Sequence, residues 1–341
     1  MNEAINICKN CGGIVTYDIK KHGLACSYCG TVDVLRPCYM RIKKHLFTNG
    51  FTFPSLSTKF SQYKCPNCNS ITDSEHNNVT NCPSCGASPL ALVAHLSVAP
   101  DGIIPFSLPK NEISNYFKQW LKKKIFAPRS LKKLKRFDVL KSIYYPVYAF
   151  DYSSNFSYTA VGIKVVSKTD DKTVTTRTPF SGNFVSSGTN DLISANTNLD
   201  TDEIKELGPF NLTQCQPFNR KYLFGFYAPD ANITPTQSHT TLIKHLNEKY
   251  ENAVRRENSL KYSEIVDFNG TTTLTNEYLA LVYLPIWTAS YTYGGKNYRC
   301  LINGTNGQIS GSTPISKGKI IGLGCIIISI MILAIILLNI L

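Results

Sequence analysis

Cys8-Lys9-Asn10-Cys11 is followed, after fourteen intervening residues, by Cys26-Ser27-Tyr28-Cys29 near the start of this chain. A gap of two residues between cysteines lets both thiolates of a tight turn point at one ion, and the spacer can form a hairpin that brings the second pair round. Gly12 and Gly30 follow the two pairs, at positions where a positive φ turns backbone N–H groups toward sulfur. This pattern predicts a Cys₄ zinc ribbon over residues 1–34.

A second set of paired cysteines repeats the pattern. Cys65-Pro66-Asn67-Cys68 is followed, after thirteen intervening residues, by Cys82-Pro83-Ser84-Cys85, which predicts a second ribbon over residues 63–95. We therefore expect two structural Zn²⁺ ions, each in a closed site that leaves no open position for catalysis. The predicted ligands are Cys8, Cys11, Cys26, Cys29, Cys65, Cys68, Cys82 and Cys85.

Other uses of paired cysteines fit this pattern less well. A disulfide framework would need an oxidising compartment, and the first residues show no apolar signal segment. A thioredoxin-like redox motif uses one such pair in a βαβ setting, whereas this chain has two matched sets. Iron–sulfur clusters also use four cysteines, but their spacings are usually tighter and less symmetric. The other cysteines have no regular spacing and are interpreted as reduced thiols: Cys38, Cys215, Cys300 and Cys325.

The composition allows two or three domains with a sizeable core. The chain has 341 residues, of which 43% are hydrophobic and 17% are charged, and its net charge is +13. It contains no P-loop, no zinc-protease motif, no nucleophile elbow and no dinucleotide-binding glycine motif. These absences disfavour an ATPase or a helicase, and an enzyme would need a site that such motifs do not reveal.

Residues 35–62 are interpreted as a linker, and residues 96–137 as an amphipathic basic helix region. Apolar residues recur at helical spacing between positions 113 and 125 and predict one buried helix face. A basic run without any acidic residue overlaps the end of this helix. It is a candidate for binding the phosphates of nucleic acid or anionic lipid, and the alternative is a solvated helix face. The run consists of Lys118, Lys122, Lys123, Lys124, Arg129, Lys132, Lys133, Lys135 and Arg136.

Residues 138–315 are predicted to form a β-rich antiparallel α+β domain. The stretches 144–152 and 283–291 share the pattern Y-x-P-[VI]-aromatic-x-x-x-Y, and each runs into turn-forming residues. We expect two related β-hairpins, which turn at residues 153–155 and 294–297.

Two further helices are predicted. Apolar residues at helical spacing indicate one helix over 236–257. Residues 320–341 carry no charge and, as a helix, would span about 33 Å, which is enough for a bilayer core. Because Lys317 and Lys319 precede this segment, it is interpreted as a transmembrane tail anchor on the cell membrane, with residues 1–319 in the cytoplasm. The expected fold class is therefore α+β, with two N-terminal Cys₄ zinc ribbons, a β-rich domain and one C-terminal transmembrane helix.

Five segments in the second half of the chain carry a family resemblance: YPVYAFD (145–151), YLFGFYA (222–228), YLPIW (283–287), YTYGGKNY (291–298) and INGTNGQISG (302–311). In this order they resemble a bacterial family often labelled transcription factor IIB-type zinc-ribbon proteins, or primosomal helicase-like proteins. The resemblance covers most of residues 1–315 and implies N-terminal zinc ribbons. A helicase activity does not fit this chain, because the ATP-binding motif that it requires is missing.

Three functions follow as hypotheses. The first is a membrane-tethered cytoplasmic binding or adaptor protein without catalysis, which contacts a protein partner through its ribbons and its basic helix. The second is a nucleic-acid-binding factor, for which strongly salt-dependent binding is expected. The third is an enzyme with an unrecognised site in residues 138–312. Expected partners are the membrane through the C-terminal helix, a protein, and nucleic acid or anionic lipid at the basic run.

Overall fold

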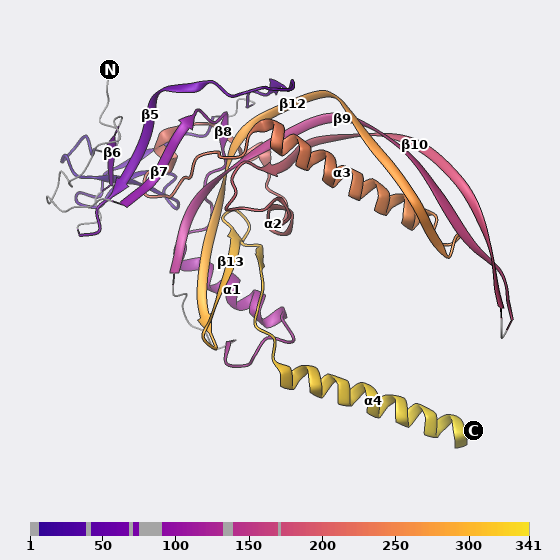
Figure 1. The fold of residues 1–341 in the computed structure, drawn as a ribbon. Coiled ribbons are helices and arrows are strands. Elements are labelled where there is room, and N and C mark those ends of the chain that lie inside the picture. Colours follow the sequence, from indigo (N-terminus) through magenta and orange to yellow (C-terminus); the bar gives the residue numbers. More distant parts are fainter. Residues whose placement is uncertain are drawn as a thin grey trace. The chain divides into compact units, whose positions relative to one another are not determined.

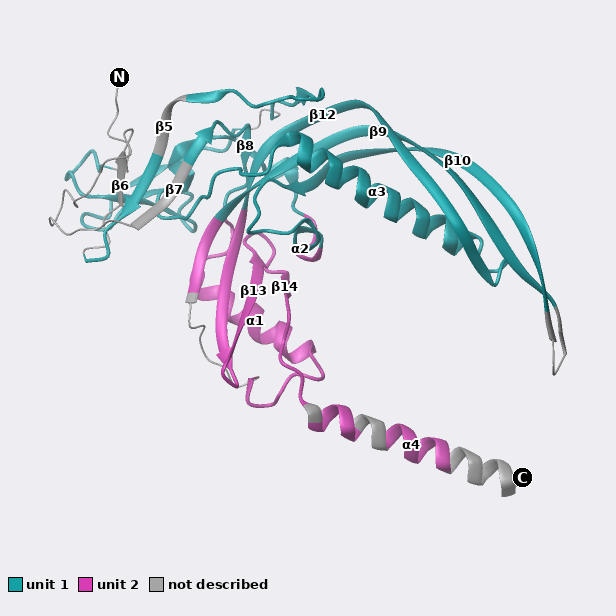
Figure 2. Cartoon of the chain, in the orientation of Figure 1, with its two compact units in different colours: residues 1–105, 144–205, 210–284 teal, residues 106–143, 206–209, 285–341 magenta. Residues whose placement is uncertain are grey.

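The computed structural model of this protein describes residues 7–38, 42–67, 71–74, 91–131, 139–169 and 172–340 (Figure 1). The chain divides into two compact units (Figure 2). Unit 1 comprises residues 1–105, 144–205 and 210–284, and unit 2 comprises residues 106–143, 206–209 and 285–341. The two longest strands, β9 (Val139–Thr169) and β12 (Glu264–Tyr293), each contribute to both units.

The first ribbon forms as the cysteine spacing predicts. Three short strands, β1 (Val15–Asp18), β2 (Gly23–Cys26) and β3 (Val32–Val34), make an antiparallel sheet in the order β1-β2-β3. The Asp18 carboxylate accepts hydrogen bonds from the backbone N–H groups of Lys20 and Lys21, at 2.9 and 3.1 Å. This side chain therefore closes the turn that joins the two long sides of the hairpin.

A second three-stranded sheet follows in unit 1. It has the order β6-β5-β7 and consists of β5 (Ser55–Lys64), β6 (Ile71–Ser74) and β7 (Ala91–Val98). Cys65 directly follows β5 and is buried. The three other predicted ligands of the second zinc ion, Cys68, Cys82 and Cys85, lie outside the described residues.

The largest sheet of unit 1 is built from very long strands. β10 (Lys172–Ser194) pairs antiparallel with β9, from Lys172 opposite Thr169 to Ser194 opposite Val147, and β12 lies on the other side of β9. Three two-residue strands join its border: β4 (His45–Leu46), β8 (Gly102–Ile103) and β11 (Gln216–Pro217). Three short helical segments lie along the connections, α2 (Thr201–Glu206), η2 (Leu212–Gln214) and η3 (Arg220–Leu223).

Helix α3 (Pro235–Glu257) lies along one face of this sheet (Figure 1). It starts with a capping box between Thr234 and Gln237, with Pro235 in the first turn, where its missing N–H costs nothing. Its buried face carries Leu242, Leu246, Tyr250 and Val254, which pack with aromatic residues of β9 and β10. The prediction of a helix over 236–257 is confirmed.

Unit 2 contains helix α1 (Lys110–Lys123), the end of β12, and two strands that continue the sheet, β13 (Lys296–Asn303) and β14 (Ile309–Gly311). The predicted turn between β12 and β13 is present, with Gly294 and Gly295 at φ of 57° and 74°. Trp287 packs edge to face with Phe106, at 5.3 Å between ring centroids, and donates its indole N–H to the carbonyl of Leu108. This packing fixes the chain that leads into α1.

The predicted turn at residues 153–155 is wrong. β9 runs through this stretch as one strand of 31 residues. Ser154 is buried there, and its hydroxyl lies 2.7 Å from the Tyr250 hydroxyl of α3 and 3.2 Å from the carbonyl of Ser186. A turn-forming residue type is tolerated inside a strand when its polar group finds partners from other elements.

The predicted α+β class is also wrong, because the described part of the chain is mostly β-structure with few helices. The reason lies in strand length. Segments that local patterns divide into short hairpins merge into strands of 31, 23 and 30 residues in β9, β10 and β12.

The last element is helix α4 (Lys317–Ile340). Among the residues that the structure describes, no helix is long and apolar enough to cross a membrane, so the prediction of a transmembrane helix at 320–341 is wrong.

Candidate metal centre

Four cysteines of the first ribbon converge on one point. The Sγ atoms of Cys8, Cys11, Cys26 and Cys29 all lie within 4.8 Å of one another. Cys8 and Cys29 are 3.6 Å apart, and Cys11 and Cys26 are 3.5 Å apart. A tetrahedral metal ion with metal–sulfur bonds of about 2.3 Å places its sulfur ligands about 3.8 Å from one another. The four thiols therefore have the spacing of a metal-binding Cys₄ cluster, as predicted.

The first pair of ligands sits on a tight backbone turn. The N–H of Gly12 donates to the carbonyl of Cys8 at 2.9 Å, and the N–H of Cys8 donates to the carbonyl of Gly13 at 2.6 Å. Gly12 has a φ of 70°, and no atom lies within 4 Å of the position that its Cβ would occupy. Backbone conformation rather than space therefore demands glycine here.

The second pair of ligands repeats this geometry. The N–H of Gly30 donates to the carbonyl of Cys26 at 3.1 Å, the N–H of Cys26 donates to the carbonyl of Thr31 at 2.9 Å, and Gly30 has a φ of 74°. Two turns of the same shape, held face to face by the β1–β2 hairpin, bring the four thiols together.

The pKa values of Cys29 and Cys11 are shifted in opposite directions. The Thr31 hydroxyl, helped by the Thr31 backbone N–H, lowers the pKa of the Cys29 thiol to about 5. The Gly13 backbone acts to lower the pKa of Cys11, but the neighbouring Cys29 and Cys26 thiols raise it to about 12. Four adjacent thiolates would repel one another unless a cation lay between them. The cluster therefore suits a divalent metal ion, which requires deprotonated sulfur ligands.

The donor set also decides what the metal can do. Cys8 and Cys26 are buried, whereas Cys11 and Cys29 are exposed. With sulfur at all four tetrahedral positions, no position remains for water or substrate. The arrangement supports a structural role in folding the ribbon.

One side of the ribbon is attached to the rest of unit 1. The backbone N–H of Tyr17 donates to the carbonyl of Phe224 at 2.9 Å. The Tyr17 ring packs edge to face on the Tyr222 ring, with centroids 5.2 Å apart. Lys221 adds an ion pair with Asp33 at 3.4 Å. No sequence pattern predicted this attachment, which joins the first ribbon to the YLFGFYA segment at 222–228.

The turns that carry the cysteines face solvent. Tyr28 is 77% exposed, and its ring lies against Gly13, where an added Cβ would come within 2.6 Å of the ring. The Asn10 amide donates to the Thr31 hydroxyl at 3.4 Å, which links the two turns. We call this region the knuckle surface, and we define it by the exposed residues Lys9, Asn10, Tyr28 and Thr31.

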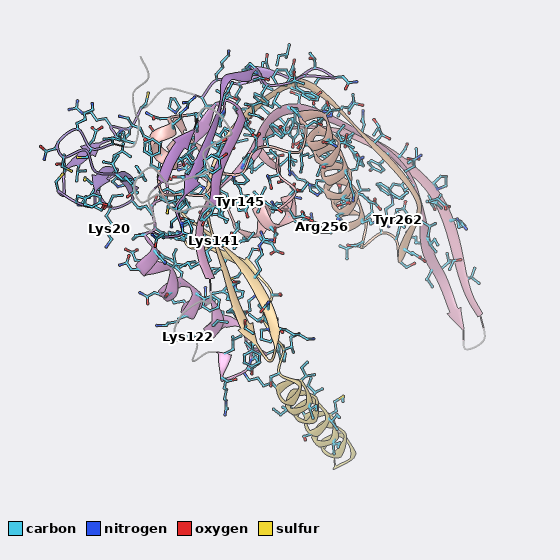
Figure 3. All side chains as sticks on the ribbon, turned by 60° about the vertical axis from the view of Figure 1, so that its left-hand side comes forward. Lys20, Lys122, Lys141, Tyr145, Arg256 and Tyr262 are labelled. Atoms are coloured by element: carbon cyan, nitrogen blue, oxygen red, sulfur yellow. The ribbon has the colours of Figure 1, made fainter. Side chains whose placement is uncertain are left out.

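The structure describes five residues of the predicted basic run. Lys118, Lys122, Lys123 and Arg129 are exposed, and the Lys124 ammonium lies over the Trp120 ring at 4.9 Å from its centroid. Figure 3 labels Lys122 on α1 and Lys20 at the turn of the first ribbon. Helix α1 buries Ile113, Phe117 and Leu121 and exposes Lys118, Lys122 and Lys123. The other members of the run lie outside the described residues: Lys132, Lys133, Lys135 and Arg136.

Comparison with known proteins gives one informative similarity. The chain is 25% identical, over 323 residues, to "Uncharacterized protein YdjG" of Bacillus subtilis (strain 168). The aligned region covers 92% of this chain and 91% of that protein. No protein-family model matches the chain, and no solved structure matches it. The similarity extends over nearly the whole length of both proteins and carries no statement of activity.

Proposed function

We propose that this chain is a non-catalytic zinc-ribbon protein that binds a protein partner through its first ribbon. The observation that carries the proposal is the closed Cys₄ cluster on a ribbon with two different sides. One side is attached to unit 1 through Tyr17, and the knuckle surface is left to solvent.

Four sulfur ligands in tetrahedral arrangement suit Zn²⁺ or iron, and of the two we propose zinc. The Sγ separations of 3.5 and 3.6 Å leave room for one ion and not for a cluster with several irons. The ion would stabilise the ribbon by its binding free energy, since the sulfur sites form only in the folded state. The second set of cysteines extends the proposal to two ions per chain.

The knuckle surface supports the binding role. Tyr28 is a large aromatic side chain held in place against Gly13 and exposed to solvent. Aromatic residues of this kind dominate the binding energy of many protein interfaces, because they bury a large area at a small cost in side-chain entropy. The exposed Tyr28 side chain is not part of the ribbon core, to which the buried side chains of Tyr17 and Leu24 belong.

The test is affinity purification of the full chain from cells, comparing the native protein with the Tyr28→Ala variant after nuclease treatment. A partner that the native chain retains and the variant loses, while metal content stays the same, supports the proposal. Tyr278→Ala, which truncates a partly exposed tyrosine on β12, is the matched control. Identical partners with and without Tyr28 would exclude the knuckle surface as the contact.

A second candidate function rests on the exposed lysines of α1. In the described part of the chain, no ion pair between side chains involves Lys118, Lys123 or Arg129. A surface of this kind supports binding to nucleic acid through its phosphates, which would be strongly salt-dependent. Complete loss of the purified partner after nuclease treatment would favour this candidate over a protein partner.

A further inference from the structure

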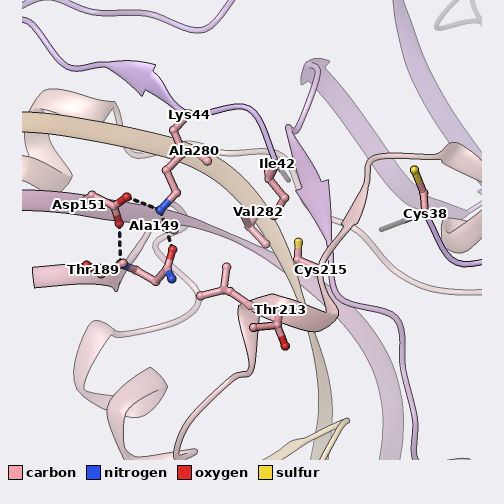
Figure 4. Close-up of a pocket in the computed structure, with 12 residues that line it drawn as sticks. Cys38, Ile42, Lys44, Ala149, Asp151, Thr189, Thr213, Cys215, Ala280 and Val282 are labelled. Carbon is pink, nitrogen blue, oxygen red and sulfur yellow. Dashed lines mark hydrogen bonds and ion pairs between the residues drawn. The ribbon is translucent and has the colours of Figure 1, made fainter. Parts of the chain in front are cut away.

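We propose that unit 1 holds a small carboxylate ligand with an apolar tail in a cavity between β9, β12 and the segment around η2. The cavity has a volume of about 700 Å³ (Figure 4). This lies within the range of about 300 to 1,000 Å³ that is typical of small-molecule sites. The proposal is independent of the zinc ribbon and of any protein partner.

The apolar wall of the cavity comes from the centre of the large sheet. Ala149 of β9 and Ala280 and Val282 of β12 line it, together with Ile42 and Leu212. Ala149, Ala280 and Val282 are almost completely buried. Ala149 and Ala280 carry small side chains, so an alkyl chain could pack against this wall.

The polar end of the cavity is an ordered set of three side chains. The Lys44 ammonium donates to the Asp151 carboxylate at 2.5 Å and to the side-chain oxygen of Asn190 at 2.7 Å. The other Asp151 oxygen accepts the backbone N–H of Asn190 at 2.7 Å. Both oxygens of Asp151 are therefore engaged, and its charge is offset by Lys44.

Unused hydrogen-bond donors remain at this end of the cavity. A lysine ammonium has three N–H groups and an asparagine amide nitrogen has two, and the contacts described above use two from Lys44 and none from the Asn190 amide nitrogen. A ligand head with two acceptor oxygens can meet both side chains at once. A carboxylate fits this requirement, because it can accept from the Lys44 ammonium and from the Asn190 amide nitrogen, which an ammonium head cannot do.

Backbone geometry at Asn190 supports a built site. Asn190 has a φ of 59°, and the pairing of β10 with β9 shifts in register between Gly188 and Asp191. Such bulges re-aim a side chain and are common beside functional sites. Here the bulge turns both the side chain and the backbone N–H of Asn190 toward the Lys44–Asp151 pair. No sequence motif marks this site, because its polar residues are far apart in the chain.

The test is isothermal titration calorimetry of the purified, metal-loaded full chain with sodium octanoate, and with octylammonium chloride for comparison. We expect saturable binding of octanoate, and binding of octylammonium at least ten-fold weaker. Absence of saturable octanoate binding up to millimolar concentration would overturn the proposal, as would equal affinity for the two probes.

Two variants locate the binding. Asn190→Gly keeps the backbone conformation, since glycine accepts a positive φ, but removes the amide, so octanoate affinity should fall about ten-fold. Ala280→Leu fills the apolar end and should abolish binding. Lys244→Met, which removes an exposed lysine from α3, is the control and should bind as the native chain does. Because Asn190→Gly strains no backbone, unchanged affinity in that variant, with its melting curve intact, would show that octanoate binds elsewhere and would overturn the proposal.

Discussion

The backbone N–H of Tyr17 donates to the carbonyl of Phe224 at 2.9 Å, which joins the hairpin of the first ribbon to a loop more than two hundred residues away in the sequence. The Tyr17 side chain is buried in the same contact, between Tyr222 and Phe226. The ribbon is therefore packed against the rest of unit 1 by its β1 strand, and its cysteine-bearing turns remain at the surface.

Replacement of Tyr17 should release the ribbon without removing its metal. The Tyr17→Ala variant loses a buried aromatic ring, which typically costs about 3 to 5 kcal/mol of unfolding free energy. Hydrogen exchange should speed up in β1–β3 and around residues 222–226, while zinc content is retained. Tyr28→Ala, in which the lost ring is exposed, should change the unfolding free energy by less than about 0.5 kcal/mol. Equal exchange rates in the two variants would contradict this attachment.

Replacement of one metal ligand should remove one zinc ion. In a Cys26→Ser variant, elemental analysis should show one zinc per chain fewer than in the native protein, which we expect to hold about two. Hydrogen exchange should show that the first ribbon alone has unfolded, because the binding energy of a structural site is local folding energy. Cys300→Ser, at a buried cysteine far from the cluster in sequence, should leave the zinc content unchanged. Iron in place of zinc, or an unchanged zinc content in Cys26→Ser, would refute the assignment.

The buried contact between Ser154 and Tyr250 should contribute measurably to stability. The Ser154→Ala variant leaves the Tyr250 hydroxyl without this partner, at a cost of about 1 to 3 kcal/mol in unfolding free energy. Adding Tyr250→Phe should cost less than the sum of the two single substitutions, because the unsatisfied group is then gone. Urea unfolding of the four proteins measures this coupling. Strict additivity would show that the two hydroxyls do not interact.

Stability should fall at alkaline pH. Burial raises the pKa of Tyr148 and of Tyr152 above the ordinary value, and that of Tyr283 well above it. These phenols stay protonated in the folded chain but ionise in the unfolded chain at about pH 10. Their stabilising contribution is complete below that pH and is lost as the pH rises above it, because the unfolded state then binds fewer protons.

Urea midpoints measured between pH 8 and 11 test this expectation, with tyrosinate absorbance recorded in parallel. Tyr283→Phe should reduce the dependence of stability on pH above 10, although it also loses the hydrogen bond from the Tyr283 hydroxyl to the Pro229 carbonyl at 2.8 Å. A urea midpoint that does not change between pH 9 and 11 would contradict the expectation that these phenols are protonated in the folded chain and ionised in the unfolded chain.

Charge reversal on α1 tests the candidate nucleic-acid surface. Changing Lys118, Lys122 and Lys123 to glutamate should weaken binding to a mixed-sequence oligonucleotide, most strongly at low salt, where charges are least screened. Reversal of three basic residues on α3, Lys244, Lys249 and Arg256, is the matched control. An equal loss of oligonucleotide affinity in both variants would indicate a general effect of net charge. No loss in either variant would indicate that the lysines of α1 only form a solvated helix face.

The sequence alone was sufficient for features that depend on neighbouring residues. The cysteine spacing and the glycines at positions 12 and 30 determine the metal-binding turns, because each turn closes through backbone bonds within a few residues. The apolar spacing of α3 likewise predicts that helix. The glycine pair at positions 294 and 295 predicts the turn between β12 and β13.

Only the tertiary structure decided what depends on distant partners. Ser154 is a turn-forming residue type, but its hydroxyl contacts the buried Tyr250 hydroxyl, and β9 continues through this position. The described part of the chain is mostly β-structure because long strands replace the predicted short hairpins. The polar end of the cavity joins Lys44 to Asp151 and Asn190 across 107 and 146 positions of sequence. Such contacts form because long strands bring remote residues into register. No pattern confined to a short window of sequence can reveal them.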